Sequence, residues 1–300
     1  MRLNFIFLVG ICFLFFVSFV YADTINFSDE AAFERLLPLH KIKTPPGEND
    51  WLANHREDGQ SYSEYIKSNP PLPSKDRRII YITLLGKFSP AGKQIIKDTV
   101  KYIEAFFGLP VKFAPSISLS SIPSYAKRIH PLTHDHQILS SYVIEKILIP
   151  NMPSDAFCFL AFTSSDLWPG KGWNYVFGQA SVVDRVGVWS IYRYGDPAKD
   201  QAAYKLCLKR AIKTGVHEIC HILGFHHCIF YECVMNGSNY RIELDSRPLW
   251  LCPVCLRKLC WALGLDPVDR YRKLLKLCHD FGFIEEEAFF RKSIGVLMHE

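Results

Sequence analysis

The chain has 300 residues, of which 49% are hydrophobic and 14% aromatic, with a formal net charge of +5. This composition excludes a disordered, collagen-like or low-complexity protein, and the length suits one sizeable catalytic domain with extensions or two modest domains. So small a net charge gives little reason to expect nucleic-acid binding. Ten cysteines are the unusual feature, because eight of them follow residue 206, where disulfides, metal binding and redox chemistry compete as explanations.

The first 22 residues have the pattern of a secretory signal peptide. Arg2 precedes an apolar run over 5–20, and small residues at Val20 and Ala22 fit a cleavage site after Ala22. An uncleaved membrane anchor is the alternative, because the run approaches the ~20 residues that span a bilayer. The expected location is therefore the secretory pathway or the cell exterior. No stable membrane association is expected once the leader is cleaved.

Residues 23–76 are polar and are interrupted by prolines at 45–46 and again at 70–73. A short helix is expected to begin at Ser28, with acidic residues in its first turn. We expect residues 23–76 to form an extension that wraps on the main body, which leaves residues 77–300 as the main domain.

The middle of the chain alternates strand and helix patterns. Residues 78–85 are rich in β-branched and aromatic residues and predict a strand. A helix follows, with Ser89 as its N-cap, Pro90 as its first residue and Gly108 at its end. Further strands are expected at 111–113, 156–163, 175–183 and 186–194, and a second amphipathic helix at 136–148. This alternation predicts an α/β domain with a mixed sheet.

A long helix is predicted over 202–223. Its buried stripe consists of Ile212, Val216, Ile219 and Leu223, which recur at helical spacing. After this helix the regular strand signals stop, and one more helix is expected from Pro267 to about Cys278. The acidic run at 285–287 is interpreted as a solvated helix face.

The long helix ends in an H-E-x-x-H motif formed by His217, Glu218 and His221. Residues four apart lie on one face of a helix, so both histidines can bind one metal ion. Glu218 can face the same cavity without binding the ion, which is the position that a general base needs.

Gly224 and His227 extend the motif to H-E-x-x-H-x-x-G-x-x-H, the metzincin signature. The glycine allows a sharp turn after the helix, which brings His227 to the metal as a third nitrogen ligand. Three protein ligands leave one position of a tetrahedral zinc ion open for water, as in catalytic sites. Any one of these histidines alone would more often be an ordinary core or surface residue. His226 is an alternative third ligand that fits the spacing less well.

Four cysteines follow directly with the spacing C-x4-C-x18-C-x2-C, namely Cys228, Cys233, Cys252 and Cys255. Such pairs suit a closed, structural zinc site of four thiolates, which would hold the third histidine in place. Two disulfides are the alternative, and the leader makes it a serious one. The remaining mature cysteines are expected to be small buried apolar residues: Cys158, Cys207, Cys220, Cys260 and Cys278.

The run over 217–259 resembles the archaemetzincins, a family of metzincin-type zinc metallopeptidases. The family pattern continues the histidine motif with C-x4-C-x-M and then C-x-x-C, and this sequence carries every element, including Met235. Weaker similarity extends to 173–181 and 50–52. Most of the mature chain is therefore expected to belong to the family.

The resemblance implies an α/β fold of the α+β metzincin type. It implies a mixed sheet with an active-site helix above a smaller lower subdomain, which the four-cysteine zinc site staples together. It also implies two zinc ions per chain, one catalytic and one structural, with Met235 in a turn beneath the catalytic ion. Family members are mostly intracellular, whereas this chain carries a leader. Gly237 stands where some other metzincins have a tyrosine that stabilises the oxyanion, and Tyr240 is a weak substitute.

The expected activity is zinc-dependent hydrolysis of peptide bonds in a peptide or protein substrate, with Glu218 as general base. The substrate is expected to lie extended along an edge strand at 175–181. The alternative is a catalytically inactive zinc protein that acts as a binding module, although a purely structural site has no need of Glu218. The sequence also has glycosylation sequons at Asn26 and Asn236. The second is expected to stay unmodified because it adjoins Met235.

Overall fold

The structure is a computed structural model that describes residues 30–298. The predicted signal peptide, the sequon at Asn26 and the predicted helix start at Ser28 lie outside the described residues. Within residues 30–298, no helix combines the length and apolar character that a membrane crossing requires.

The central layer is a five-stranded sheet with the strand order β2-β1-β5-β8-β7. Its strands are β1 (Ile79–Leu85), β2 (Val111–Phe113), β5 (Ala156–Thr163), β7 (Gly178–Ser181) and β8 (Val186–Ser190). Neighbouring strands are parallel except for β7, which runs antiparallel to β8 at one edge. All eight residues of β5 are buried, which explains its continuous apolar sequence. The predicted mixed sheet of an α/β fold is confirmed.

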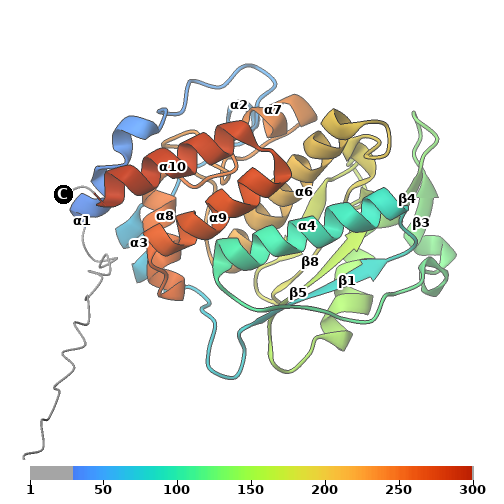
Figure 1. The fold of residues 1–300 in the computed structure, drawn as a ribbon. Coiled ribbons are helices and arrows are strands. Elements are labelled where there is room, and N and C mark those ends of the chain that lie inside the picture. Colours follow the sequence, from blue (N-terminus) through green and yellow to red (C-terminus); the bar gives the residue numbers. More distant parts are fainter. Residues whose placement is uncertain (1–29, 299–300) are drawn as a thin grey trace, which may run out of the picture.

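Alternate residues of β5 face two separate cores. Cys158, Leu160 and Phe162 belong to the larger core, which also contains the buried faces of α4 (Pro90–Phe107) and α6 (Gln201–Ile222). Phe159 and Ala161 face a smaller core that is covered by the helical turn Val143–Leu148. Helices therefore lie on both faces of the sheet, and Figure 1 shows α4 and α6 on the same side of it.

The helix signals that were strongest in the sequence are confirmed. Ser89 caps α4 by accepting a hydrogen bond from Gly92 N–H at 3.0 Å, and Gly108 ends it with φ 61°. The predicted stripe of α6 is fully buried. Because that stripe faces the core, the other side of the last turns of α6 is left open for the metal motif.

The helix predicted over 136–148 is wrong in its first part. His136–Leu139 forms the strand β4, followed by the short helix α5 (Ser140–Tyr142) and a π-helical turn over Val143–Leu148. β4 pairs with β3 (Lys127–Ile129) and β6 (Asp166–Trp168) in a second, three-stranded sheet. The reason is a long-range contact, since buried Gln137 donates to Asp166 Oδ2 at 2.7 Å, which local periodicity does not reveal.

Two predicted strands are shorter than expected. The strand expected at 175–183 is reduced to β7, and the strand expected at 186–194 ends at Ser190. Ser190 Oγ accepts a hydrogen bond from Tyr192 N–H at 3.0 Å, which starts the 3-10 turn Tyr192–Tyr194.

The C-terminal part is helical: α7 (Arg241–Ser246), α8 (Pro253–Leu263), α9 (Pro267–Phe281) and α10 (Ile284–Met298). The sequence predicted α9, which runs three residues further than expected, and it did not predict α7 or α8; for α10 it indicated only a helix face at 285–287. The interpretation of 285–287 as a solvated face is wrong for Glu286, which is 4% exposed and pairs with Lys209 at 2.8 Å.

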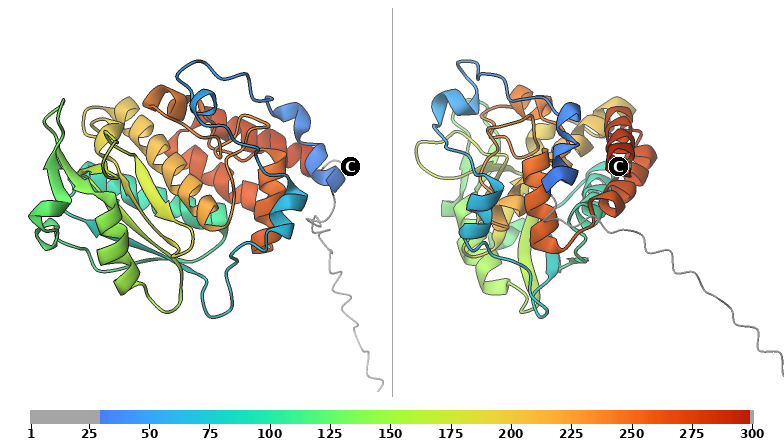
Figure 2. Two further views of the ribbon diagram at one scale, coloured as in Figure 1. Left: turned by 180° about the vertical axis from the view of Figure 1, so that it is seen from behind. Right: turned by 90° about the vertical axis from the view of Figure 1, so that its left-hand side faces the viewer.

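The N-terminal segment contains the short helices α1 (Glu30–Glu34), α2 (Trp51–Asn54) and α3 (Tyr62–Lys67). Figures 1 and 2 show this segment, in blue to cyan, beside the orange and red C-terminal helices. α1 and α3 both pack against α8, and Phe33 and Tyr65 are buried in the larger core. Part of the core of the molecule thus comes from the N-terminal segment.

Candidate active site

The last two turns of α6 and the chain after it bring three histidines together. The helix ends at Ile222, and Gly224 with φ 85° reverses the chain. Phe225 N–H donates to Cys220 O at 3.0 Å, which closes the turn and brings His227 back toward His217 and His221. The ligand nitrogens of these three residues all lie within 4.8 Å of one another. The structure thus brings together the three histidines that the sequence singled out.

Each of the three imidazoles is held through Nδ1. His217 Nδ1 lies 2.9 Å from Val234 O, and His221 Nδ1 lies 2.7 Å from Phe225 O. A carbonyl only accepts, so Nδ1 carries the proton and Nε2 keeps its lone pair. The two Nε2 atoms are 2.9 Å apart, so that both lone pairs can be directed toward one metal ion. This arrangement is typical of metal-binding histidines.

His227 is held by a side chain instead. Its Nδ1 lies 2.7 Å from Oε1 of Glu57, which comes from the N-terminal segment. Burial raises the pKa of Glu57. The hydrogen bond from His227 and several smaller contributions together outweigh burial and keep that pKa below its usual value of 4.5. Glu57 is therefore an ionised acceptor. Glu57 was not predicted, because nothing in the local sequence pattern around it points to a site 170 residues away.

Burial favours the neutral form of His217 and His221. Burial lowers the pKa of His221 to about 3, with a further contribution from His227. Burial also holds the pKa of His217 well below its usual value of 6.5. Neutral imidazole is the form that binds a metal ion.

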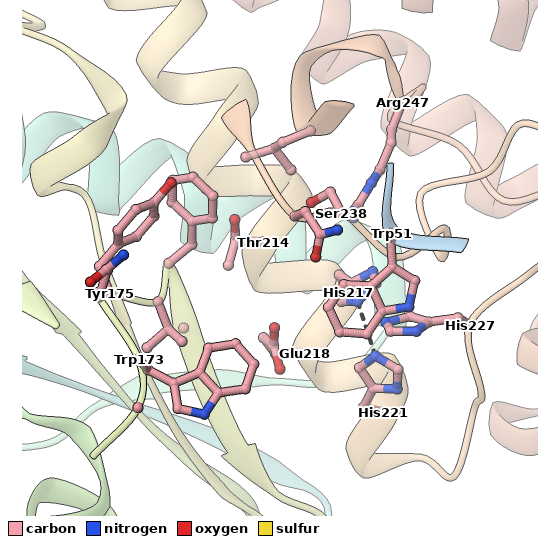
Figure 3. Close-up of a pocket in the computed structure, with 17 residues that line it drawn as sticks. Trp51, Trp173, Tyr175, Thr214, His217, Glu218, His221, His227, Ser238 and Arg247 are labelled. Atoms are coloured by element: carbon pink, nitrogen blue, oxygen red, sulfur yellow. Dashed lines mark hydrogen bonds between the residues drawn. The ribbon is translucent and has the colours of Figure 1, made fainter. Parts of the chain in front are cut away.

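Glu218 faces a cleft of about 510 Å³ together with the three histidines. Figure 3 shows Glu218 to one side of the histidine group and Trp51 across it. Burial raises the pKa of Glu218 to about 7, and the positive charge of Arg247 opposes that shift. A carboxyl group with a pKa near neutrality can both take up and release a proton. The remaining lining residues are Gly172 to Gly178, Thr214, Ser238, Asn239 and Leu244.

The four predicted cysteines form a second cluster. The sulfur atoms of Cys228, Cys233, Cys252 and Cys255 lie within 4.8 Å of one another, and all four residues are buried. Cys228 Sγ and Cys252 Sγ are 3.6 Å apart, well beyond a disulfide bond. Backbone N–H groups of Met235 and Cys252 point at Cys233 Sγ at 3.5 and 3.3 Å. All nine cysteines within the described residues are free and buried.

The turn that contains Met235 connects the two clusters. Met235 O accepts from Cys228 N–H at 2.8 Å, while the preceding Val234 O holds His217. Asn236 is 1% exposed, and its Nδ2 donates to Cys228 O and Tyr231 O at 2.7 and 2.9 Å. A glycan would replace one of the two Nδ2 hydrogens and break at least one of these bonds, and Asn236 is buried, so Asn236 is still expected to be unmodified.

Position 237 has no room for a side chain. A Cβ on Gly237 would come within 2.6 Å of Trp51 Nε1, and closer still to Cδ1 of the same ring. The ring of Trp51 thus fills the space that a side chain at position 237 would occupy. Tyr240 does not line the cleft; its hydroxyl donates to Asp50 Oδ1 at 2.6 Å.

Both clusters suit zinc by the chemistry of their donors. Three imidazole nitrogens form the donor set of an open, catalytic zinc site, and four thiolates form that of a closed, structural one. In the histidine group the donated Nδ1 protons leave three Nε2 lone pairs, which is the set that a metal requires. The residues present therefore fit this metal.

Comparison with known proteins identifies the family. Residues 154–260 match the model of peptidase family M54. The chain is 36% identical over 295 residues to archaemetzincin-2 of Mus musculus, covering 87% of this chain and 81% of the relative. Identity to archaemetzincin-2 of Homo sapiens is 35% over 264 residues, with 77% and 72% covered. The crystal structure of an archaemetzincin from Methanopyrus kandleri superposes with a TM-score of 0.51 at 26% identity, covering 64% of this chain and 99% of that one. The chain therefore belongs to the archaemetzincins, a family of zinc metallopeptidases.

Proposed function

We propose that this protein hydrolyses peptide bonds in the cleft above α6, in the manner of a metzincin. His217, His221 and His227 would hold the catalytic zinc ion, and Glu218 would act as general base. The observation that carries the proposal is the convergence of three Nε2 atoms beside a carboxyl group in one cleft. Membership of a zinc metallopeptidase family supports it.

The chain's own residues would supply the proton transfers. A zinc ion held by the histidines supplies Lewis acidity, which makes water acidic near neutral pH and polarises a substrate carbonyl. Glu218 takes a proton from the attacking water and gives it to the leaving amine nitrogen. Its raised pKa, at about 7, suits both steps.

The substrate would lie along the edge of the main sheet. β7 is the last strand in the sheet order, and residues 172–178, which lead into it, line the cleft. An extended peptide can add to such an edge through backbone hydrogen bonds. The expected partner is therefore a peptide or an extended segment of a protein.

A second zinc ion would be bound by Cys228, Cys233, Cys252 and Cys255. Such a closed site would be structural. It would fix the turn after α6, because Cys228 adjoins His227. The backbone carbonyl of Cys228 also accepts a hydrogen bond from the side-chain amide of Asn236. We propose residues 77–300 as the peptidase domain and residues 23–76 as its extension.

The test is the variant Glu218→Gln. We expect zinc content to stay at the wild-type level and peptide cleavage to fall by about 10²–10⁴-fold, the usual contribution of a general base. Glu285→Gln removes an exposed glutamate on α10 and serves as the matched control. Metal analysis and cleavage of a peptide library measure the two quantities. Wild-type rates in Glu218→Gln would exclude the mechanism.

A further inference from the structure

The N-terminal segment places Trp51 in the lining of the cleft and Glu57 against His227. Glu57 Oε1 accepts hydrogen bonds from His227 Nδ1 at 2.7 Å and from Trp51 Nε1 at 2.9 Å. The Trp51 ring stacks on His55 at 3.9 Å and meets the edge of His227 at 5.2 Å. Figure 3 shows Trp51 lying across the histidine group. Trp51 and Glu57 thus form one unit with the third histidine.

Several contacts tie this segment to the loop that follows His227 and to the first turn of α7. Trp51 N–H donates to Glu243 Oε1 at 2.9 Å, and Tyr240 donates to Asp50. Further back along the segment, Ile42 pairs with Tyr231 as an isolated bridge. In addition, the Trp51 ring occupies the space that a side chain on residue 237 would fill, which only a glycine allows. The segment and the loop are therefore shaped for each other.

The three histidines differ in what holds them. His217 and His221 rest on backbone carbonyls, which any residue at those positions supplies. His227 depends on a single carboxylate from a distant part of the chain. Residues that orient a metal ligand typically change metal affinity by about 10–100-fold when they are mutated.

We propose that residues 41–60 are an integral part of the active site, in which Glu57 is the positioning residue for His227 and Trp51 forms a wall of the cleft. The inference requires only that the histidine group binds zinc, not that the protein cleaves peptides. It implies that the N-terminal extension is no removable propeptide. Proteolytic removal of residues 23–60 would weaken zinc binding at the histidines rather than activate the protein.

The experiment measures zinc affinity in the full chain. Zinc is titrated against a competing chelator for wild type, Glu57→Ala, Glu57→Gln and the control Glu48→Gln, an exposed glutamate of the same segment. We expect Glu57→Ala to weaken the binding of one of the two zinc ions by about 10–100-fold and to leave the affinity for the other unchanged. Glu57→Gln keeps an oxygen acceptor, so it should recover part of the loss, and Glu48→Gln should match wild type.

Retention of the second, cysteine-bound zinc ion shows that a variant is folded. Unchanged zinc affinity in Glu57→Ala would overturn the proposal. Equal losses of zinc affinity in Glu57→Gln and in Glu48→Gln would overturn it as well. If Glu57→Ala fails to fold, Glu57→Gln against Glu48→Gln decides the matter. Because no cleavage is measured, the outcome is independent of the proposed peptidase activity.

Arg247 carries a second, independent inference. It lines the cleft beside Leu244, is 6% exposed, and has an Nε atom without a hydrogen-bond partner. Within residues 30–298, no hydrogen bond or ion pair involves its guanidinium. The nearby carboxylate of Glu243 serves other donors, the backbone N–H groups of Trp51 and Asn239. In Figure 3 its side chain points toward Ser238 and the histidine group.

We propose that Arg247 binds a carboxylate of the substrate. This inference rests on the proposed function. A buried guanidinium that donates no hydrogen bond is costly even near the carboxylates of Glu243 and Glu218, and a planar substrate carboxylate would satisfy its donor fork with two hydrogen bonds. The carboxylate can belong to an aspartate or glutamate side chain or to the C-terminus of the peptide, so the peptide variants must separate these sources.

Binding is measured with the Glu218→Gln variant, so that it does not depend on turnover. Peptides are compared with Glu against Gln near the scissile bond, and with a free against an amidated C-terminus. We expect one carboxylate form to bind at least about 10-fold more tightly, and Arg247→Met in the same background to abolish the difference. Equal binding of all peptides, or a preference that survives Arg247→Met, would contradict the inference. Cleavage by the wild type, assayed separately, reports on the proposed function itself.

Discussion

At the scale of single residues, Gly237 shows how closely the N-terminal segment fits the cleft. Gly237→Ala would place a methyl group inside the ring of Trp51, so the ring must move and its bond to Glu57 is lost. We expect the free energy of unfolding to fall by about 1–3 kcal/mol, the usual cost of overpacking. Denaturant unfolding followed by tryptophan fluorescence measures it.

Two controls separate the clash with Trp51 from the general effect of replacing a glycine by an alanine. Gly295→Ala lies in α10 where a methyl group meets nothing within 4 Å, so it should be neutral or stabilising. In the Trp51→Ala background the cost of Gly237→Ala should largely vanish, because the clash partner is gone. A cost that stays the same in that background would show that Trp51 is not the cause.

Single residues of the site were predictable only where their spacing is local. His217 and His221 share a helix face, and Gly224 and His227 follow at fixed offsets, so the sequence shows them together. Glu57 and Arg247 have no such register with the histidines. The roles proposed for them rest on tertiary contacts between segments far apart in the chain, which a local pattern does not encode.

At the scale of elements, strong periodicity was a reliable guide and weak periodicity was not. α4 and α6 have capped ends and an apolar stripe, and β5 is apolar throughout, so all three were predicted. Residues 136–148 satisfy a helical period as well, yet β4 forms there because its partners lie in another strand. α8 was not predicted because two of the four clustered cysteines stand at its start, where their spacing favours a metal site and hides the helical pattern.

The junction of α6 and α7 should make stability depend on pH. Lys213 of α6 is buried and donates to Leu244 O and Asp245 O at 3.1 and 2.8 Å. Burial lowers its pKa from 10.5 to about 8. Between pH 8 and 10.5 the unfolded chain therefore binds more protons than the folded one. The contribution of Lys213 to the free energy of unfolding therefore rises with pH between pH 8 and 10.5, and it is lowest below pH 8.

Lys213→Met removes the titration, so the comparison with wild type isolates it. From pH 8 to 10.5, the wild type should gain about 3 kcal/mol of unfolding free energy relative to Lys213→Met. Chemical denaturation at several pH values measures the difference. Lys273→Met, at an exposed position of α9, should give a difference that does not vary with pH. A flat difference for Lys213→Met would show that the lysine is not perturbed.

At the scale of the whole molecule, the two clusters lie at different depths. The histidine group opens to the cleft, whereas the four cysteines are part of the larger core. The sequence predicted both clusters and the sheet, but not that residues of the N-terminal segment are packed into the same core. Phe33 and Tyr65 are buried there through contacts with α8, which no signal near them indicates.

This difference in depth predicts two steps when metal is removed. A mild chelator should take the zinc ion from the histidines, which stops cleavage and leaves the melting temperature nearly unchanged. A thiol-directed mercurial should then release the second ion and unfold the C-terminal part. Structural zinc sites can contribute about 10 kcal/mol or more, comparable to the whole stability of a domain. Zinc analysis and circular dichroism after each step measure the result.

The same experiment decides between zinc and disulfides in the cysteine cluster. Ten cysteines less Cys12, which lies in the predicted signal peptide, leave nine. If the cluster binds zinc, the denatured and demetallated protein should react as nine thiols and should have released two zinc ions. If secretion oxidises the cluster to two disulfides, nine less four leaves five thiols, one zinc ion is found, and mercurial treatment gives no second step. The separation of 3.6 Å between two of the sulfur atoms, with backbone N–H groups directed at a third, leads us to expect the first result.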